Sequence, residues 1–299
     1  MVFEKTPGDR PIMIKVSVII PFYNSQRYIK NCIEGILQQS YPREQYEILM
    51  IDNNSTDASA ETVRQYPGIR LLSESKQGAY AARNRGLQEA KGDIIAFTDA
   101  DCVPSHEWLH KIVTAIEQPG LNIVLGRRKF AGDSLLLSML AAYDHEKHRY
   151  VFNSERKELY YGHTNNMAVK KKLFDELGPF VERARGGDTI FVRQSVNKYS
   201  CGVVRYCPKI QVLHMEIDTL GKLYRKFFIY GRSSRGFWRV VRVEPLTNRE
   251  RLQVFQNVVQ NRGYSWKESL ILMGLLWTGL AFWSLGKISL IRGKKENVI

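Results

Sequence analysis

Two aspartates, Asp99 and Asp101, stand one residue apart directly after the apolar run at 94–97. Alternate side chains of an extended backbone point to the same side, so this spacing directs both carboxylates one way. Two carboxylates this close repel each other and need a positive partner to remain ionised. Mg²⁺ and Mn²⁺ prefer oxygen ligands, and phosphates often complete the shell of Mg²⁺. The spacing predicts a divalent cation that binds a diphosphate, and a solvated turn is the alternative.

The aspartate pair follows the fourth of four predicted strands. Continuous apolar runs typical of buried strands occupy 15–21, 46–52, 69–72 and 93–97, and helical spacing occupies 29–37, 79–90 and 108–117. This alternation predicts a parallel sheet with helices on both faces, and Pro21 is expected to end the pairing of the first strand. Ligands of such sheets bind at the carboxyl ends of the strands. Tyr23, Asp52 and Asp99 all fall there.

The segment 78–86 predicts a helix that begins with small residues and carries Arg83 one turn in. A helix N-terminus attracts anions through its free N–H groups, and an arginine can add a bidentate phosphate contact. A surface helix with solvated arginines is the alternative.

The chain has 299 residues, enough for a substantial core, and a net charge of +14. Residues 205–299 hold 17 Lys and Arg against 6 Asp and Glu, which places +11 in the last third. The four cysteines form no Cys-x-x-Cys pair, so we expect free thiols. Residues 1–13 contain acidic residues and two prolines and lack a long apolar core, so we expect no signal peptide there.

Four segments together resemble the successive motifs of family-2 glycosyltransferases, which have the GT-A fold: Val18-Ile19-Ile20-Pro21-Phe22-Tyr23-Asn24, 51–57, 78–86 and 92–101. The resemblance implies inverting transfer of a sugar from a nucleotide-diphosphate donor, with a UDP-sugar favoured and Mn²⁺ or Mg²⁺ as cofactor. It implies an α/β fold, a Rossmann-like and mainly parallel sheet flanked by helices.

The resemblance also implies roles for individual residues. Nucleotide-sugar binding would fall to Pro21, Tyr23, Asn24, Asp52, Arg83, Asp99 and Asp101, and metal binding to Asp101, Asp99 and His214. His163, Asn165 and Asn166 lie in a segment, 161–170, that resembles an acceptor-binding loop, although they can equally cap the following helix. His214 can equally be a packed or solvated side chain at a strand end.

Asp188 is the candidate base, because inverting transfer needs a group that takes the proton of the attacking hydroxyl. It lies where the family usually has Gly-Glu-Asp, and Gly187 stands in place of the glutamate. A helix N-cap is the alternative role of this aspartate.

The C-terminal third is basic and then apolar. Residues 220–243 interleave arginines and lysines with aromatic residues, and 269–286 contains 18 uncharged residues flanked by Trp266, Trp283, Lys267 and Lys287. This length and these flanks predict a membrane helix, spanning or lying in the interface, rather than a nucleic-acid arm. A hydrophobic helix docked on the domain or on a second subunit is the alternative.

The predicted organisation is an N-terminal tail (1–14), a catalytic domain (15–218, with a nucleotide-sugar half at 15–125 and an acceptor half at 126–218) and a helical, membrane-associating region (219–299). The predicted function is sugar transfer to a lipid-linked or polysaccharide acceptor at the cytosolic membrane face, with no nucleic-acid partner and with contacts between copies through the C-terminal helices. One alternative is an inactive scaffold that binds membrane or nucleic acid. Another is a nucleotidyltransferase, but no Gly-rich phosphate loop, as that function would suggest, follows the first strand.

Overall fold

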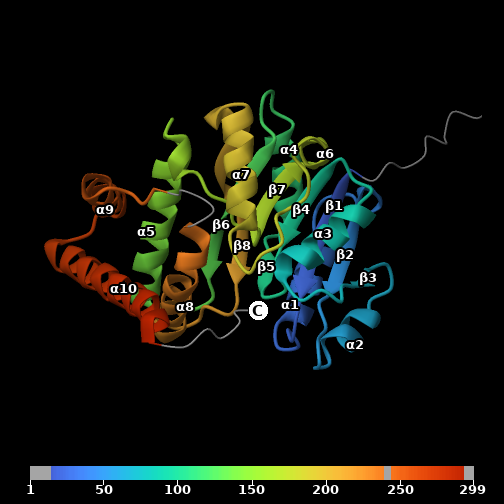
Figure 1. Ribbon diagram of the computed structural model, residues 1–299, viewed down its shortest axis with the longest axis horizontal. Coiled ribbons are helices and arrows are strands. Elements are labelled where there is room, and N and C mark those ends of the chain that lie inside the picture. The colour runs from blue at the N-terminus through green and yellow to red at the C-terminus, as the bar shows by residue number, and fades with distance from the viewer. Residues whose placement is uncertain (1–14, 239–243, 293–299) are drawn as a thin grey trace, which may run out of the picture.

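The computed structural model describes residues 15–238 and 244–292. The predicted tail at 1–14 and the basic residues Arg239 and Arg242 lie outside the described residues. One sheet of eight strands, in the order β3-β2-β1-β4-β7-β6-β8-β5, runs through the described part of the chain, and helices cover both of its faces (Figure 1). The α/β fold expected from the alternating pattern is confirmed.

The first half of the sheet is parallel, as predicted. It contains β1 (Val16–Phe22), β2 (Tyr46–Asp52), β3 (Arg70–Ser73) and β4 (Ile94–Thr98), connected by α1 (Ile29–Leu37), α2 (Ser59–Arg64) and α3 (Ala79–Glu89). The prediction that Pro21 ends strand pairing was wrong for one side of β1. Pairing with β4 ends at Ile19, whereas pairing with β2 continues through Pro21 to Phe22.

Alternate residues of the central strands build two separate cores. Val18 and Ile20 of β1 pack with α1 and with α4 (Trp108–Ile116) on one face. Ile19 packs on the other face with α3, α6 (Lys171–Leu177) and α7 (Gly187–Lys198). Burial of both faces explains why these strands are continuously apolar in the sequence.

The second half of the sheet is mixed. β7 (Asn166–Lys170) runs antiparallel to β4 and to β6 (Ile123–Phe130), β8 (Val204–His214) is parallel to β6, and β5 (Cys102–Pro104) is antiparallel to β8. The loop expected over 161–170 therefore ends in a strand. The separate strands expected at 202–206 and 211–214 form the single strand β8, which contains an irregularity opposite Gly126 and Arg127.

The three last helices pack beside α5 (Leu135–Phe152) at one end of the molecule (Figure 1). They are α8 (Leu220–Trp238), α9 (Asn248–Arg262) and α10 (Trp266–Arg292). Close packing of α8 on α10 depends on glycines, because a Cβ at Gly231 would collide with the Trp283 carbonyl and one at Gly286 with the Phe228 carbonyl. Within the described residues, α10 is the one helix long and apolar enough to cross a membrane.

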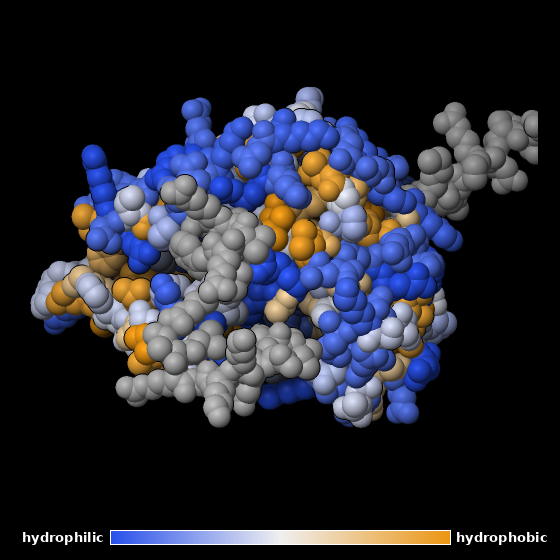
Figure 2. Space-filling view, in the orientation of Figure 1, coloured by the Kyte–Doolittle hydropathy of each residue, from blue (hydrophilic) through white to orange (hydrophobic). Residues whose placement is uncertain are grey.

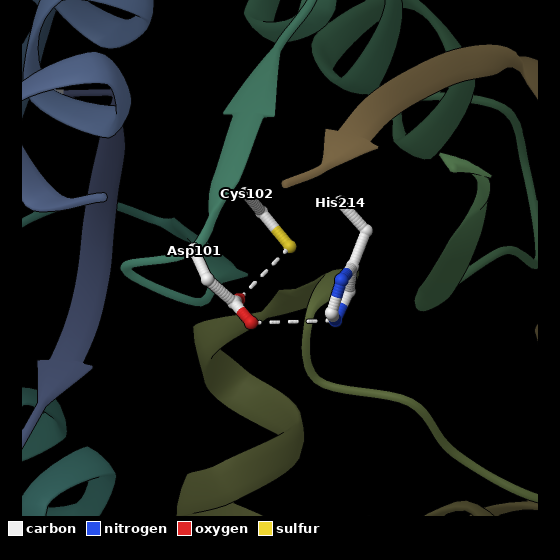
Figure 3. Close-up of side chains that lie close together, drawn as sticks. All are labelled: Asp101, Cys102 and His214. Atoms are coloured by element: carbon white, nitrogen blue, oxygen red, sulfur yellow. Dashed lines mark hydrogen bonds and ion pairs between the residues drawn. The ribbon is translucent and has the colours of Figure 1, made fainter. Parts of the chain in front are cut away.

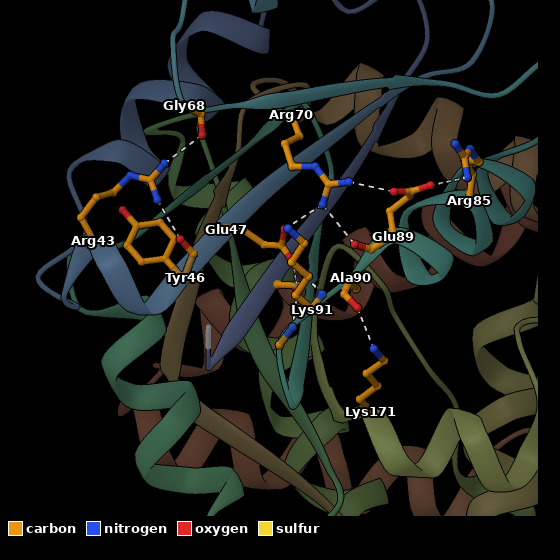
Figure 4. Close-up of polar contacts among 12 residues, drawn as sticks. Arg43, Tyr46, Glu47, Gly68, Arg70, Arg85, Glu89, Ala90, Lys91 and Lys171 are labelled. Atoms are coloured by element: carbon orange, nitrogen blue, oxygen red, sulfur yellow. Dashed lines mark hydrogen bonds and ion pairs between the residues drawn. The ribbon is translucent and has the colours of Figure 1, made fainter. Parts of the chain in front are cut away.

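An ion-pair network ties the strands together at the edge of the sheet where β1 and β2 begin (Figure 4). Glu47 accepts hydrogen bonds from Ser17 Oγ at 2.7 Å and from the Lys91 backbone at 2.6 Å. Arg70 joins Glu47 at 2.9 Å to Glu89 at 2.8 Å. The buried Glu47 carboxylate thus accepts from several donors, as a stable buried charge requires. It lies at the opposite end of the strands from the polar residues predicted to bind ligand.

Candidate functional site

A cavity of about 480 Å³, here called the first cavity, opens at the carboxyl ends of β1 and β4. Side chains predicted to bind nucleotide sugar line it, namely Pro21, Tyr23, Asn24, Arg83, Asp99 and Asp101. Asp52 is not among the lining residues, but the next residue, Asn53, is. The parallel register of β1, β2 and β4 brings together groups that are far apart in the sequence.

The loops that follow β1 and β2 are held to each other by hydrogen bonds. The Thr56 backbone donates to Asn24 Oδ1 at 2.8 Å, and the Ser55 backbone donates to Asp52 Oδ1 at 2.9 Å. Asn24 and Asn54 have φ angles of 48° and 67°, a left-handed conformation that asparagine adopts more readily than most residues. Asp52 therefore shapes the loop beside the cavity.

Arg83 reaches from α3 to Asp99 at the end of β4. Its guanidinium Nη2 lies 2.5 Å from Asp99 Oδ1, and its side chain is 6% exposed. The Nε of Arg83 has no partner among the described residues. Asp99 therefore has the positive partner that its charge requires, and Asp101 does not share it.

Asp101 and His214 meet because β5 pairs with the end of β8, where Cys102 lies opposite His214 (Figure 3). Asp101 Oδ2 lies 3.5 Å from His214 Nε2. Lys226 of α8 donates to the same nitrogen at 3.2 Å and pairs with Glu216 at 2.6 Å. The Nε2 lone pair of His214 accepts this hydrogen bond, so a metal ion would have to displace Lys226 to bind the nitrogen.

These donors fit a divalent metal ion. Burial, and secondarily the neighbouring Asp99, raises the pKa of Asp101 to about 7. The positive charge of Lys226 is thus too small to keep this carboxylate fully ionised, and a cation would stabilise its ionised form. Burial and then Lys226 lower the pKa of His214 to about 2, which keeps the imidazole neutral and able to ligate. Burial raises the pKa of the Cys102 thiol well above its usual range, so this group stays protonated and is a poor ligand for a hard cation.

A second cavity of about 590 Å³ adjoins the first, because Ala79, Arg83 and Asp99 line both. Asp188 lines the second cavity near the start of α7 and is 8% exposed. Its carboxylate accepts from Tyr80 Oη at 2.7 Å, from the Thr189 backbone at 2.8 Å and from the Thr164 backbone at 3.2 Å. Burial raises the pKa of Asp188, and the Tyr80 hydrogen bond opposes that shift.

Gly187 is required by the packing around Asp188. A Cβ at this position would lie 2.7 Å from the Val181 carbonyl and 3.0 Å from the Tyr80 ring. Tyr80 thus fills the space beside the helix start, and its hydroxyl is the side-chain donor to Asp188. The N-cap residue of α7 is Gly186, so Asp188 does not serve as the cap.

The predicted acceptor residues divide into two groups. His163 and Asn165 line the second cavity, and His163 Nε2 donates to the Gly126 carbonyl at 3.1 Å. Asn166 is 1% exposed, lines neither cavity, and accepts from Trp108 Nε1 at 2.8 Å while its amide donates to two backbone carbonyls. Asn166 therefore holds strands together away from the site.

Sequence reasoning missed four polar residues at the site: Tyr80, Arg128, Glu216 and Lys226. Tyr80 lies within the motif at 78–86. A tyrosine on the buried face of a helix needs a hydrogen-bond partner for its hydroxyl, and this need was the signal that could have pointed to a site role. Lys226 is one of many cations on a basic helix, and no local pattern distinguishes it.

Comparisons with known proteins identify the family of the chain. The model of the Glycosyl transferase family 2 matches residues 17–178. The chain is 31% identical over 239 residues to Glycosyltransferase AglE of Haloferax volcanii, which covers 76% of this chain and 75% of that protein.

Two solved structures share the fold. Mannosyltransferase PcManGT from Pyrobaculum calidifontis, in complex with GDP-Man and Mn²⁺, has a TM-score of 0.59 and 19% identity, covering 95% of this chain and 77% of that one. S. aureus TarS in complex with UDP-GlcNAc has a TM-score of 0.54 and 16% identity, and the match covers 95% of this chain and 93% of that one. With the family model matching more than half of its length, the chain belongs to glycosyl transferase family 2.

Proposed function

We propose that this chain transfers a sugar, with inversion, from a nucleoside-diphosphate sugar to a hydroxyl of a lipid-linked or glycan acceptor. The observation that carries the proposal is the junction of two cavities at Arg83 and Asp99. One cavity presents ligands for a cation, and the other presents a buried carboxylate suited to remove a proton.

In this proposal the first cavity holds the nucleotide. Tyr23 and Asn24 contact the nucleoside, and Asp52 acts through the loop that it holds. Arg83, which lines this cavity beside Asp99, contacts the diphosphate. Asp101, with His214 and Asp99 nearby in the fold, would hold Mn²⁺ or Mg²⁺, which supplies positive charge for the leaving nucleoside diphosphate. A UDP-sugar is the first donor to test, and a GDP-sugar the second.

Asp188 is the proposed general base. A carboxylate whose pKa is raised by burial is a better proton acceptor than a solvated one, as catalysis near neutral pH requires. Hydrogen bonds from Tyr80, Thr164 and Thr189 fix its orientation. The acceptor hydroxyl would approach through the second cavity, beside His163 and Asn165.

We further propose that the enzyme works at the cytosolic face of a membrane through α10. Only 17% of its apolar segment Trp266–Ser289 is buried within the protein, and Trp266, Trp277 and Leu285 are exposed. Figure 2 shows apolar residues interspersed with polar ones on the side of the molecule where α10 lies in Figure 1. Packing of α10 along α8 favours a helix in the membrane plane, because a spanning helix would have to leave the domain. Pairing of two copies through these helices is the competing arrangement.

The test combines binding and turnover. UDP and GDP are added with and without Mn²⁺, and we expect a metal-dependent rise in melting temperature with one of them. Release of nucleoside diphosphate from the matching sugar donor then reports transfer. Asp188→Asn should keep the melting shift and lose turnover, Asp101→Ala should lose both, and the exposed Asp133→Asn should lose neither.

An inactive scaffold is the outcome if no nucleotide shifts the melting temperature. Gly187 was its main support in the sequence, but the space that a side chain would need is filled by Tyr80 and the Val181 carbonyl. The carboxylate at Asp188 remains buried and oriented in spite of this difference from the usual family pattern.

A further inference from the structure

An apolar groove of about 550 Å³ lies between α5, α8, α9 and α10. Its lining includes Tyr143, Phe227, Phe255, Met273, Leu280 and Trp283. Trp283 also lines the second cavity, which contains Asp188. The groove and the proposed acceptor cavity therefore share Trp283 in their linings, and a ligand extending past this residue would contact both.

The second cavity is lined by three arginines, Arg83, Arg128 and Arg185, and by two aspartates, Asp99 and Asp188. Arg128 and Arg185 line it, and Arg128 lies 3.1 Å from Asp144, which also pairs with Lys147 at 3.1 Å. Asp144 thus pairs with two partly exposed cations, and Arg128 Nε has no hydrogen-bond partner among the described residues.

The histidines beside these cations add no charge of their own. Burial lowers the pKa of His148 to about 4 and that of His163 well below its usual range, so both rings are neutral. Arg185 is half-buried, with its guanidinium 4.6 Å from the Tyr230 ring. An anionic group entering this cavity would therefore meet Arg128 and Arg185, in a lining whose three arginines outnumber its two aspartates.

We infer that the acceptor is a long-chain lipid phosphate that carries the accepting sugar. Its phosphate binds Arg128 and Arg185, and its hydrocarbon chain passes Trp283 into the apolar groove. The inference rests on the proposed function, because it names the acceptor of the same site. It is supported by the arginines of the cavity and by the adjacent apolar groove, which shares Trp283 with it.

The first experiment measures binding of isoprenyl monophosphates with one, two and three isoprene units, in buffer free of detergent and membrane. Each buried methylene strengthens binding, so the Kd should fall at least about tenfold per added unit. Leu280→Glu places a charge in the groove at a partly exposed position and should abolish this dependence. Leu285→Glu is the matched control, since Leu285 lies on the same helix, is exposed and does not line the groove.

The second experiment compares each phosphate with the corresponding isoprenyl alcohol. Loss of charge-assisted hydrogen bonds to arginine should weaken binding of the alcohol about tenfold or more. Arg185→Gln should reduce the difference between phosphate and alcohol, and its half-buried position makes the substitution safer for folding than one at Arg128.

The outcomes separate this inference from the proposed function. Isoprenyl phosphates that bind with no dependence on chain length, or fail to bind, overturn the inference, while a metal-dependent melting shift with UDP or GDP leaves the sugar-transfer proposal intact. Absence of that nucleotide shift overturns the proposed function, and the inference with it.

Discussion

Substitution of Tyr80 by phenylalanine should raise the pKa of Asp188. The Tyr80 hydroxyl donates to Asp188 Oδ1 at 2.7 Å in a buried environment, and this bond opposes the effect of burial. Phenylalanine keeps the ring that packs beside Gly187 and removes only the donor. The carboxylate keeps its backbone donors, Thr164 and Thr189, so its position should be preserved.

The magnitude follows from the strength of the lost bond. A hydrogen bond to a charged group contributes about 1.5–3 kcal/mol. Because one pKa unit corresponds to about 1.4 kcal/mol, the pKa of Asp188 should rise by about 1–2 units. The base is active only when deprotonated, so the rate on the acid side should fall at a correspondingly higher pH. Well above both pKa values, Tyr80→Phe and the natural protein should react at similar rates.

Two assays measure this shift. Carbon-13 NMR of the aspartate carboxyl groups follows the titration of Asp188 directly, with Asp188→Asn assigning its resonance. The pH dependence of nucleoside-diphosphate release reports the same group during turnover. Tyr150→Phe is a control for the substitution itself, because Tyr150 lines a different cavity.

An unchanged carboxyl titration in Tyr80→Phe would show that the hydrogen bond does not set the pKa of Asp188. A shifted titration with an unchanged acid limb of the rate would instead remove Asp188 from the role of base. Either result refutes the chain of reasoning from Tyr80 to proton transfer.

Three further changes, and one control substitution, probe the cation site and the close packing of helices. Asp101→Asn should abolish the Mn²⁺-dependent part of the nucleotide melting shift, because it removes a charged oxygen ligand. Gly187→Ala should destabilise the fold by about 1–3 kcal/mol through overpacking, measured by urea unfolding. Gly286→Ala should lower the free energy of unfolding by about as much, because the added Cβ would collide with the Phe228 carbonyl. It should also speed amide hydrogen exchange in α10. Gly274→Ala, with open space around its Cβ, should instead be neutral or stabilising.

The parallel half of the sheet was predictable because its strands are buried on both faces. The predicted strand at 46–52 matches β2, Tyr46–Asp52, and the helix expected at 79–90 matches α3 within one residue. Strand β7 was missed because its apolar centre, 167–169, is only three residues long and lies between Asn166 and Lys170. Its antiparallel place between β4 and β6 depends on long-range pairing, which local periodicity does not encode.

The site was predictable where a motif carried the chemistry. The motif and the resemblance placed Asp101 and His214 at one site, and β5–β8 pairing brings them within 3.5 Å. The hydrogen bond from Tyr80 to Asp188 spans 108 residues, and Lys226 reaches His214 from a separate helix. Such contacts are set by how helices dock on the sheet, and a single sequence contains no pattern for them.

Lys226 ties the charge balance of the cation site to the C-terminal helices. Its ammonium lies against Glu216 and His214, while its neighbours Phe227 and Phe228 meet glycines of α10. A metal ion arriving beside Asp101 would compete with this ammonium for the same acceptors, and a displaced lysine would loosen α8 from the sheet. If metal binding loosens α8 in this way, it changes the affinity of α10 for any partner that binds there. Thermodynamic reciprocity then requires that the same partner change the affinity for the metal by the same factor.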